Sequence, residues 1–367
     1  MVCLRPFPVL VILLAVVGTA ASAQAQPSDA SRDSAALENK LLEAVKENPD
    51  SFEARHMLAV FYLRQGKVKQ ALPQLERAAA INPSSYEAGY DLARALLETG
   101  RLDDARSQTK RWLARKDVGE LHNLLGDIEE RAGNLTGAAE EYQRAAHMDP
   151  IEEHLFDWGD NLLQLRAYDA AAEVFGASIK RQPQSARLRV GLGIAQYSRG
   201  EYQDAVQSFC DAADLSPSDP RPYQFLGEMY GVSPEMAKEI SRRMARFVET
   251  HPKNALAHFH YAMSLRKDSG ESASADDLRR IEDLLKRAVQ LDPRLARGFF
   301  ELGVLQAEQQ RYDAAIEHLR RATVLQPSLS QAHYRLALVY QRTGRKDLAA
   351  KELETFRQLT ASGGDKQ

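Results

Sequence analysis

The sequence is poor in cysteine, with only Cys3 and Cys210. Cys3 precedes an apolar run at the start of the chain and would leave with that run if it were removed. The one remaining thiol cannot form an internal disulfide. Because Cys210 follows Phe209 among apolar residues, we expect a buried, inert thiol. An intermolecular or reactive cysteine is the alternative.

The sequence also lacks a large surplus of either charge. It has 51 acidic and 48 basic side chains, which give a formal net charge of -3. Binding to nucleic acid or to anionic lipid draws on a surplus of lysine and arginine. We therefore expect no nucleic-acid partner.

Signatures of catalysis are missing as well. The sequence contains no glycine-rich phosphate loop, no G-x-S-x-G and no H-E-x-x-H. His258 and His260 are two residues apart on an expected helix, so their side chains point to different faces and cannot easily share a metal ion. Asp127, Asp157 and Asp160 are interpreted as part of a polar groove wall rather than as an acid–base pair. We expect no cofactor, no metal and no enzymatic activity.

Long hydrophobic runs are absent except for residues 9–17 (VLVILLAVV). This run follows Arg5 and precedes small-residue cleavage sites that end at Ala23 and Ala25, a pattern typical of a signal peptide. The run is shorter than the roughly 20 residues that a spanning helix needs, which disfavours the alternative of a retained membrane anchor. We expect residues 1–25 to be removed near Ala23 or Ala25. The mature chain is then periplasmic or secreted and does not span a membrane.

The dominant feature of the sequence is a period of about 34 residues. A large residue followed by a small one recurs at steps of 33 to 35 residues, with one step of 41. Such a period indicates stacked helical hairpins, each of which buries its apolar side against its neighbours. The recurring pairs are Leu58-Ala59, Leu92-Ala93, Leu125-Gly126, Trp158-Gly159, Leu192-Gly193, Leu226-Gly227, Tyr261-Ala262, Leu302-Gly303 and Leu336-Ala337.

A second small residue and a closing proline complete the repeat. In residues 296–327, Gly303 and Ala315 allow two helices to approach closely, and Leu302 and Leu319 fill the space beside them. The alanine recurs at Ala71, Ala105, Ala138, Ala171, Ala205, Ala315 and Ala349, and the proline at Pro49, Pro83, Pro150, Pro183, Pro217, Pro252, Pro293 and Pro327. This pattern resembles the tetratricopeptide repeat (TPR) family. The resemblance implies an all-α, right-handed superhelical solenoid of antiparallel helix pairs.

The period predicts how the chain is organised. We expect a flexible lead-in over residues 26–33 and an N-terminal half-repeat over residues 34–49. Nine repeats follow over residues 50–359, and residues 360–367 form a disordered tail. The seventh repeat contains an excess of about seven residues, which we place in a polar loop over residues 267–277.

Three departures from the repeat carry further expectations. Thr109 stands where a large residue is usual, and we expect Trp112 to fill that space. Ser233 and Pro234 form a helix-start signal. Ile240 and Phe247 stand where the family shows alanine, so we expect looser packing or a different angle at that junction.

Members of the family usually bind partners on the concave face formed by the first helix of each hairpin. In the middle repeats the corresponding positions are mostly acidic: Glu120, Asn123, Asp127, Glu153, Phe156 and Asp160. Toward the C-terminus they become apolar, beside Arg187, Arg221 and Arg297. We expect a partner-binding groove formed by Val190, Ile194, Tyr197, Phe259, Met263, Phe300, Val304, Tyr334 and Leu338. Burial of these side chains in the hairpin stack is the alternative.

The expected function is an exported, non-catalytic scaffold or adaptor that binds a peptide or helix of a partner protein in its groove. The lysine and asparagine with which some family members bind a chaperone's C-terminal carboxylate are replaced by His56 and Val60, so that partner class is not expected. Alternatives are a cell-envelope component that assembles through the ends of its solenoid and, less favoured, an accessory subunit of an enzyme complex. The oligomeric state stays open.

Overall fold

The computed structural model describes residues 29–232, 234–270 and 273–364. The predicted signal peptide lies outside these residues. The described chain consists of helices that divide into two compact units. Unit 1 ends at Ser178, in the last turn of α9, and unit 2 begins at Ile179. Within the described residues, no helix is both long and apolar enough to cross a bilayer.

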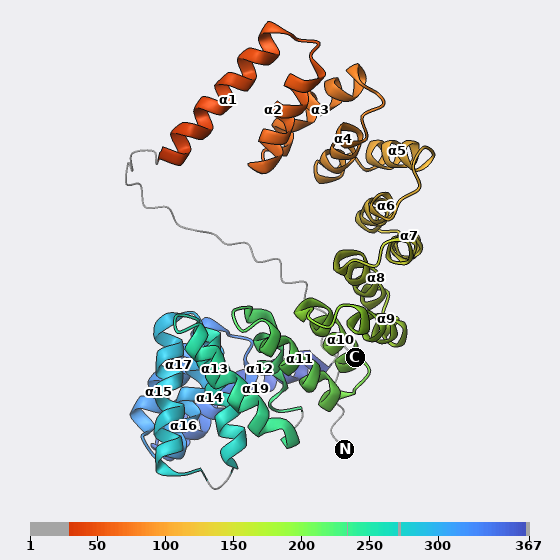
Figure 1. The fold of residues 1–367 in the computed structure, drawn as a ribbon. Coiled ribbons are helices and arrows are strands. Elements are labelled where there is room, and N and C mark those ends of the chain that lie inside the picture. Colours follow the sequence, from red (N-terminus) through yellow and green to blue (C-terminus); the bar gives the residue numbers. More distant parts are fainter. Residues whose placement is uncertain (1–28, 233, 271–272, 365–367) are drawn as a thin grey trace. The chain divides into compact units, whose positions relative to one another are not determined.

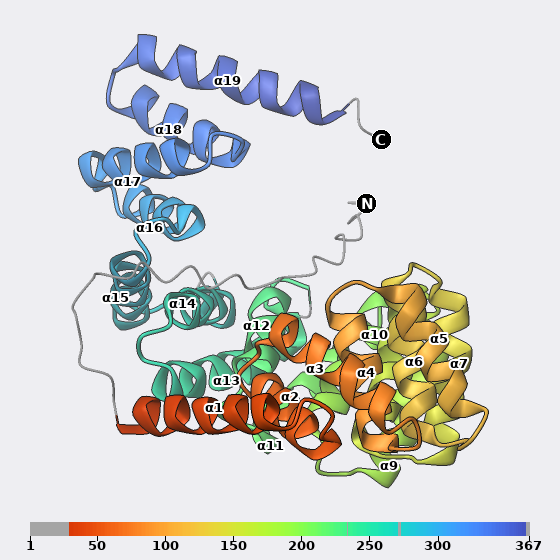
Figure 2. The same cartoon turned by 90° about the horizontal axis from the view of Figure 1, so that it is seen from above.

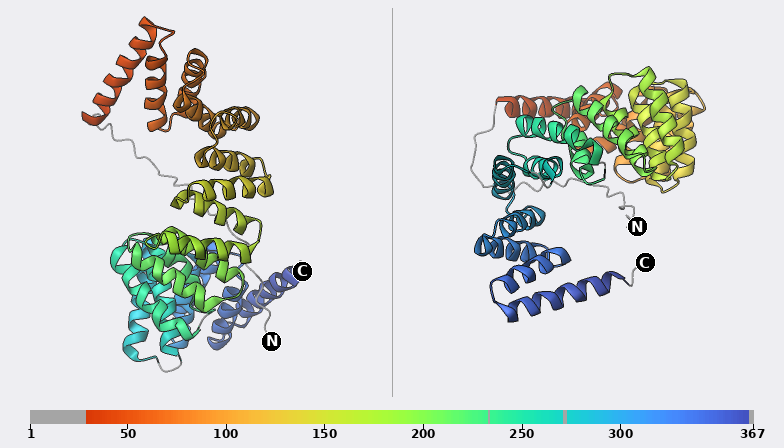
Figure 3. Two further views of the ribbon diagram at one scale, coloured as in Figure 1. Left: turned by 45° about the vertical axis from the view of Figure 1, so that its right-hand side comes forward. Right: turned by 90° about the horizontal axis from the view of Figure 1, so that it is seen from below.

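Unit 1 consists of a single helix followed by four helical hairpins (Figure 1). Figure 3 shows α1 to α7 as successive layers. The helices are α1 (Asp29–Glu47), α2 (Phe52–Arg64), α3 (Val68–Ile81), α4 (Tyr86–Glu98), α5 (Leu102–Leu113), α6 (Gly119–Arg131), α7 (Leu135–Met148), α8 (Glu152–Gln164) and α9 (Tyr168–Arg181).

Unit 2 stacks five further hairpins, and Figure 2 shows α14 to α19 as consecutive pairs. Its elements are α10 (Ala186–Ser198), α11 (Tyr202–Leu215), α12 (Pro220–Met229), the 3-10 turn η1 (Pro234–Met236), α13 (Ala237–Thr250), α14 (Ala255–Ser269), α15 (Ala275–Leu291), α16 (Ala296–Glu308), α17 (Tyr312–Leu325), α18 (Ser330–Arg342) and α19 (Lys346–Gly364). The all-α solenoid of helix pairs that the period predicts is confirmed within each unit.

The small residue of each first helix allows the second helix to pack against it. A Cβ atom added at Gly303 would lie 2.7 Å from Leu319 Cγ, and one at Gly126 would lie 2.6 Å from the Tyr142 ring. Leu319 is fully buried, so its side chain fills the space that the glycine leaves. Any larger residue at these positions would force the two helices of the hairpin apart.

The turn inside most hairpins requires a left-handed backbone. Glycine provides it at Gly66, Gly100, Gly133, Gly200 and Gly344, where φ lies between 69° and 83°. Arg166 and Gln310 occupy the same position of their repeats at φ 58° and 60°. A side chain at this φ crowds the backbone, so these two turns are strained relative to the glycine turns.

Trp112 fills the space beside Thr109, as the sequence predicts. A Cβ atom on Gly89 would overlap the Trp112 indole. Thr109 is also fully buried and donates its hydroxyl to the Ala105 carbonyl at 2.9 Å. The α4–α5 hairpin therefore reaches close packing with an indole in place of the usual large residue.

The helices extend beyond their predicted ends. Helix α1 begins at Asp29, so residues 29–33 of the expected flexible lead-in are helical. Helix α19 continues to Gly364, so residues 360–364 of the expected disordered tail are helical too. Thr360 Oγ1 donates to the carbonyls of Phe356 and Arg357 at 3.0 Å, which continues the hydrogen bonding of the last turns. Residues 26–28 and 365–367 lie outside the described part of the chain.

Helix occupies both ends of the expected loop over residues 267–277. Helix α14 runs to Ser269, and α15 begins at Ala275. Ser274 and Asp277 form a capping box, in which each side chain accepts a hydrogen bond from the other residue's backbone N–H. The expected loop is therefore shorter than predicted, because polar composition concealed this helix start.

The sixth hairpin departs from the others in its packing. Ser233 lies outside the described residues, and Pro234 begins η1 rather than α13. A Cβ atom on Gly227 would meet the ring of His260, on the first helix of the next repeat, at 2.4 Å. Ile240 and Phe247 are fully buried, and the prediction of looser packing or a different angle at this junction stays a prediction.

Candidate functional site

The first helices of unit 1 present a surface rich in carboxylates. Its side chains recur at spacings of three, four or seven residues, which places them on one side of each helix. We call this surface the acidic face. It consists of Glu120, Asp127 and Glu130 on α6 and of Glu153, Asp157 and Asp160 on α8.

Hydrogen bonds between neighbouring first helices connect residues about one repeat apart. Asn123 Nδ2 donates to Asp157 Oδ2 at 3.0 Å, and Gln164 Nε2 donates to Glu130 Oε1 at 3.1 Å. On the adjoining pair of helices, the Tyr86 hydroxyl donates to Glu120 Oε2 at 2.9 Å. The repeat therefore positions Glu120, Glu130 and Asp157 opposite a donor on the neighbouring first helix.

Tyr142 reaches the acidic face from the second helix α7. Because its ring lies over Gly126, its hydroxyl donates to Asp127 Oδ1 at 2.8 Å and contacts Glu130 Oε2 at 3.3 Å. Burial raises the pKa of the Tyr142 hydroxyl, and the two carboxylates raise it further, so Tyr142 stays a donor. This tyrosine holds Asp127 and Glu130 in place with a neutral group.

The acidic face concentrates three like charges on α6. Among the described residues, no carboxylate of the face on α6 forms an ion pair with lysine or arginine. Burial raises the pKa of Asp127 to about 6, and Asp157, Glu130 and Glu153 add to the increase, against the Tyr142 hydrogen bond. The arrangement favours the arrival of a positive charge.

Two buried amides on the face each have an unsatisfied acceptor. Asn161 is fully buried and Asn123 nearly so, and each donates its Nδ2 to a carboxylate of the face. The Oδ1 atom of each amide is buried without a hydrogen-bond partner. An unmade hydrogen bond of this kind costs about 1–3 kcal/mol, so both oxygens are acceptors in need of a donor.

The groove predicted in unit 2 is mostly core. Val190, Phe259, Met263, Phe300 and Val304 are buried and belong to the hydrophobic clusters of that unit. The prediction that these five form an exposed groove was wrong. The alternative considered from the sequence, burial in the hairpin stack, holds for them.

An ion pair across two repeats helps to cover this apolar surface. Arg297, on α16, lies over the Phe259 ring at 5.2 Å and donates to Glu228 Oε1, on α12, at 3.1 Å. These partners are 69 residues apart in sequence. Arg297 therefore covers Phe259, which lies in the repeat between those of Arg297 and Glu228. The sequence of a single repeat does not reveal this contact.

The four remaining groove residues are more accessible. Ile194 and Tyr197 are half-buried against the core of unit 2. Tyr334 is 40% exposed with its ring 5.2 Å from that of Phe356, and Leu338 is half-buried. Binding of a partner at these four positions stays a prediction.

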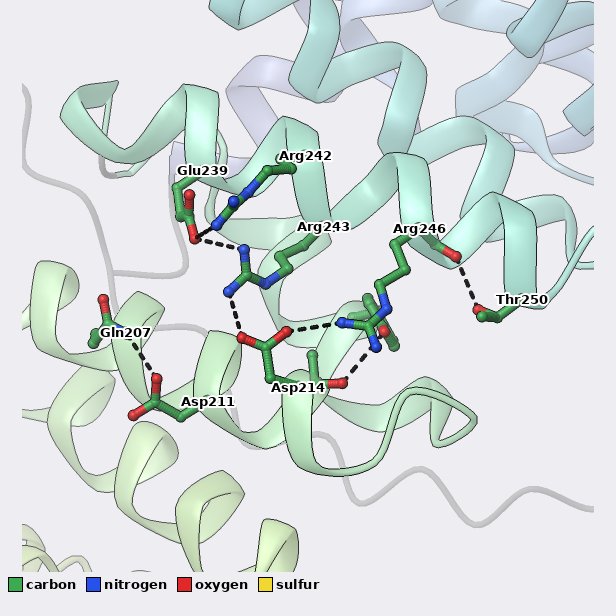
Figure 4. A network of polar contacts seen from close by, with 10 residues as sticks. Gln207, Asp211, Asp214, Glu239, Arg242, Arg243, Arg246 and Thr250 are labelled. Atoms are coloured by element: carbon green, nitrogen blue, oxygen red, sulfur yellow. Dashed lines mark hydrogen bonds and ion pairs between the residues drawn. The ribbon is translucent and has the colours of Figure 1, made fainter.

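Cys210 lies in the core of unit 2, beside a closed network of ion pairs on α11 and α13 (Figure 4). Burial raises the pKa of its thiol to about 12, which makes the reactive thiolate unfavourable. Arg243 donates to Asp214 Oδ2 at 2.6 Å and to Glu239 Oε1 at 2.5 Å, and Arg246 donates to Asp214 Oδ1 at 2.8 Å. Carboxylates here have cationic partners, unlike those of the acidic face on α6.

The histidines serve in packing and turn contacts. Burial lowers the pKa of His260 to about 4, and its ring packs on Gly227. His258 and His333 each direct Nε2 at the carbonyl of the proline six residues earlier, at 3.0 Å. Across the part of the chain that the structure describes, no three His, Cys, Asp or Glu residues are arranged to hold a metal ion.

The sequence identified part of the acidic face and missed the rest. It named Glu120, Asn123, Asp127, Glu153 and Asp160, which the structure brings onto one surface. It missed the roles of Glu130, Tyr142, Asn161 and Gln164. The 34-residue separation of Glu130 and Gln164 is the signal that could have found that pair.

Comparisons with known proteins identify the repeat. Models of the tetratricopeptide repeat match residues 40–72, 62–128, 156–220 and 331–359, and a TPR repeat model matches residues 307–344. No curated protein matches the sequence.

Solved structures similar to this chain share its fold alone. The MamA protein is 18% identical over 50% of this chain and 95% of its own, with a TM-score of 0.40. A thermophilic TPR protein of Thermus thermophilus is 22% identical over 47% and 95%, with a TM-score of 0.38. The Cut9–Hcn1 structure of the APC/C is 13% identical over 90% and 91%, with a TM-score of 0.43.

Proposed function

The chain is a tetratricopeptide repeat protein, and from this premise we propose that it is an exported, non-catalytic scaffold that binds a segment of a partner protein along its first helices. The acidic face is the observation that carries this proposal. Among the described residues, its α6 carboxylates Glu120, Asp127 and Glu130 are held by neutral donors and form no ion pair with lysine or arginine. A surface maintained against its own charge repulsion is better explained by recognition than by stability.

The arrangement of the described residues supports a scaffold rather than an enzyme. Apart from α1, the helices pair into hairpins, so no separate catalytic domain is present among residues 29–232, 234–270 and 273–364. Buried histidine and cysteine side chains have packing roles. Export rests on residues 1–25. Mass measurement of the protein recovered from its host should give a chain that begins just after Ala23 or Ala25.

Site-specific photo-crosslinking in the host tests the binding surface. A photoreactive residue at Glu153, exposed on the acidic face, should give a discrete adduct with a partner protein. The matched control is Glu140, equally exposed on the second helix α7, and should give none. Equal adducts from both positions, or no adduct from position 153, would contradict binding along the first helices.

A second candidate, assembly through the end of the solenoid at α1, is favoured by exposed apolar side chains there. Leu37 and Leu42 on α1 are 47% and 42% exposed, and Met57 on α2 is 59% exposed. If this end self-associates, Leu37→Ser/Leu42→Ser should lower the mass seen in sedimentation. Leu348→Ser, at an equally exposed leucine on α19, should not. A monomeric wild-type protein would rule out self-assembly.

A further inference from the structure

We propose that the acidic face binds an extended, arginine-bearing segment of the partner protein, with the amide oxygens of Asn123 and Asn161 as additional acceptors. This inference rests on the proposed scaffold function and names the chemistry of its partner. Two independent observations among the described residues point to the same ligand. The face carboxylates Glu120, Asp127 and Glu130 on α6 form no ion pair with lysine or arginine, and the two buried amide oxygens have no donor.

The arrangement fits a guanidinium group better than other cations. Arginine carries five N–H donors in one plane, so it can bond a carboxylate and a neighbouring amide oxygen together. Asn123 now donates to Asp157, and Asn161 to Glu130. When an arginine takes over the carboxylate, the amide is released to rotate and direct its oxygen at the guanidinium. The hydrogen bond that is missing in the free protein then forms.

A metal ion and an anionic ligand fit this surface poorly. The Tyr142 hydroxyl and the Asn123 and Asn161 amides direct hydrogens at the carboxylates, where a metal ion would need bare oxygen ligands. The described residues contain no cluster arranged for a metal ion. An anion would be repelled by the carboxylates. Lysine carries the right charge but presents it as a point, without the planar fork that engages two acceptors.

The repeat also sets the spacing of the ligand's arginines. Helices α4, α6 and α8 are successive first helices of unit 1. Packed helices lie about 8–10 Å apart. An extended chain rises about 3.3 Å per residue, so a segment crossing them advances one helix about every three residues. Arginine at every third position therefore places one guanidinium at each helix.

Binding should also depend on pH. Asp127 must be ionised to bind arginine, and its pKa of about 6 is set by burial and then by Asp157, Glu130 and Glu153. The groups facing Asp127 are Tyr142 on α7, Glu130 on its own helix, and Asp157 and Glu153 on α8. Affinity should fall up to about tenfold between pH 7.5 and pH 5, as protonation removes the charge.

The test uses the full chain and a labelled twelve-residue peptide of four Arg-Gly-Ser units, followed by fluorescence anisotropy. We expect Asp127→Asn/Glu130→Gln to weaken binding at least tenfold. The matched control, Asp103→Asn/Glu140→Gln, removes two exposed carboxylates from second helices of unit 1 and should change affinity less than twofold. Equal losses in the two variants, or no binding by the wild-type protein, would overturn the proposal.

A second variant separates specific recognition from general charge attraction. Asn123→Leu/Asn161→Leu keeps every carboxylate and the branched shape of each side chain. We expect the wild-type protein to prefer the arginine peptide over its lysine counterpart, a preference that a simple acidic patch would not show. The double variant should lose this preference. An unchanged preference for arginine over lysine would show that the Asn123 and Asn161 oxygens do not bind the ligand. If Glu153 crosslinks a partner but no arginine peptide binds, the scaffold function stands and the arginine-bearing partner is wrong.

Discussion

Units 1 and 2 share one repeat but differ in what their first helices present. Three residues before the small residue, unit 1 has Asn123 and Phe156, and unit 2 has Phe259 and Phe300. Six residues before it, unit 1 carries glutamate at Glu53, Glu87, Glu120 and Glu153, and unit 2 carries arginine at Arg187, Arg221 and Arg297. Both units keep the small residue of the repeat, while the position six residues before it changes from glutamate in unit 1 to arginine in three repeats of unit 2.

The first-helix surfaces of the two units also differ in the partners of their charged side chains. In unit 2, Arg297 covers Phe259 and bonds Glu228, so charge shields an apolar core. In unit 1, among the described residues, the carboxylates of the acidic face on α6 accept hydrogen bonds from neutral donors, such as the Tyr142 hydroxyl on Asp127, and form no ion pair with lysine or arginine. Unit 2 therefore uses its first helices for stability, and unit 1 keeps charge available at a cost in stability.

The largest expected effect comes from truncating one phenylalanine of unit 2. Phe300→Ala should lower the free energy of unfolding by about 3–5 kcal/mol, because it opens a cavity in a buried cluster. Asn123→Ala, at the same repeat position in unit 1, should cost less than about 1 kcal/mol, because it also removes an unsatisfied oxygen.

Denaturant unfolding separates these two effects. Both tryptophans, Trp112 and Trp158, lie in unit 1, so their fluorescence reports that unit, while circular dichroism reports all helices. Phe300→Ala should move the circular dichroism transition to a lower denaturant concentration and leave the tryptophan fluorescence transition less affected. Similar costs for the two substitutions would show that the two first-helix faces do not differ in their contribution to stability.

The next effect concerns the charge of Asp127. Its folded pKa is raised to about 6 from 3.8, so the native state is penalised as pH rises through 6, and the penalty is absent below 3.8. Asp127→Asn keeps an acceptor for Tyr142 and should stabilise unit 1 by about 1–2 kcal/mol at pH 7.5, and by nothing at pH 3.5.

Tryptophan fluorescence in denaturant at the two pH values measures this difference. The control is Asp103→Asn on α5, whose side chain is 99% exposed and pairs with Arg106, and which should change stability little at either pH. A gain at pH 7.5 that persists unchanged at pH 3.5 would show that charge is not its cause.

The smallest effect tests what the units share. Arg166→Gly in unit 1 and Gln310→Gly in unit 2 should each stabilise the protein by about 0.5–1 kcal/mol, because both residues have left-handed backbones. Thermal unfolding of each variant measures the gain. Gly100→Ala, at φ 79°, should show a loss of similar size. A gain in stability from only one of the two substitutions would mean that the hairpin turns of the two units are not equivalent.

The fold could be predicted because its determinants lie within one repeat. Gly303 and Leu319 are 16 residues apart, and their contact follows from two helices and a short turn. Trp112 over Gly89 was accessible to the same reasoning. The ends of α1 and α19 were not, because polar sequence gives little sign that a helix continues at the end of a stack.

The two faces were harder to predict because their contacts cross repeats. The cover over Phe259 comes from an arginine that bonds a glutamate two repeats earlier, so exposure inferred from one helix at a time was wrong. Tyr142 reaches Asp127 only because Gly126 leaves room for its ring. The carboxylates themselves were visible in the sequence, but the donors that hold them were not.

The long seventh hairpin has a consequence for engineering. Its additional residues extend α14 and α15 at their tips, and the capping box at Ser274 restarts the second helix. The close packing of Ala262 and Leu285 in the body of the hairpin is kept. Length can therefore be added at this tip without shifting the repeat, which makes the connection between Gly270 and Ser274 the natural position for a grafted tag or reporter domain.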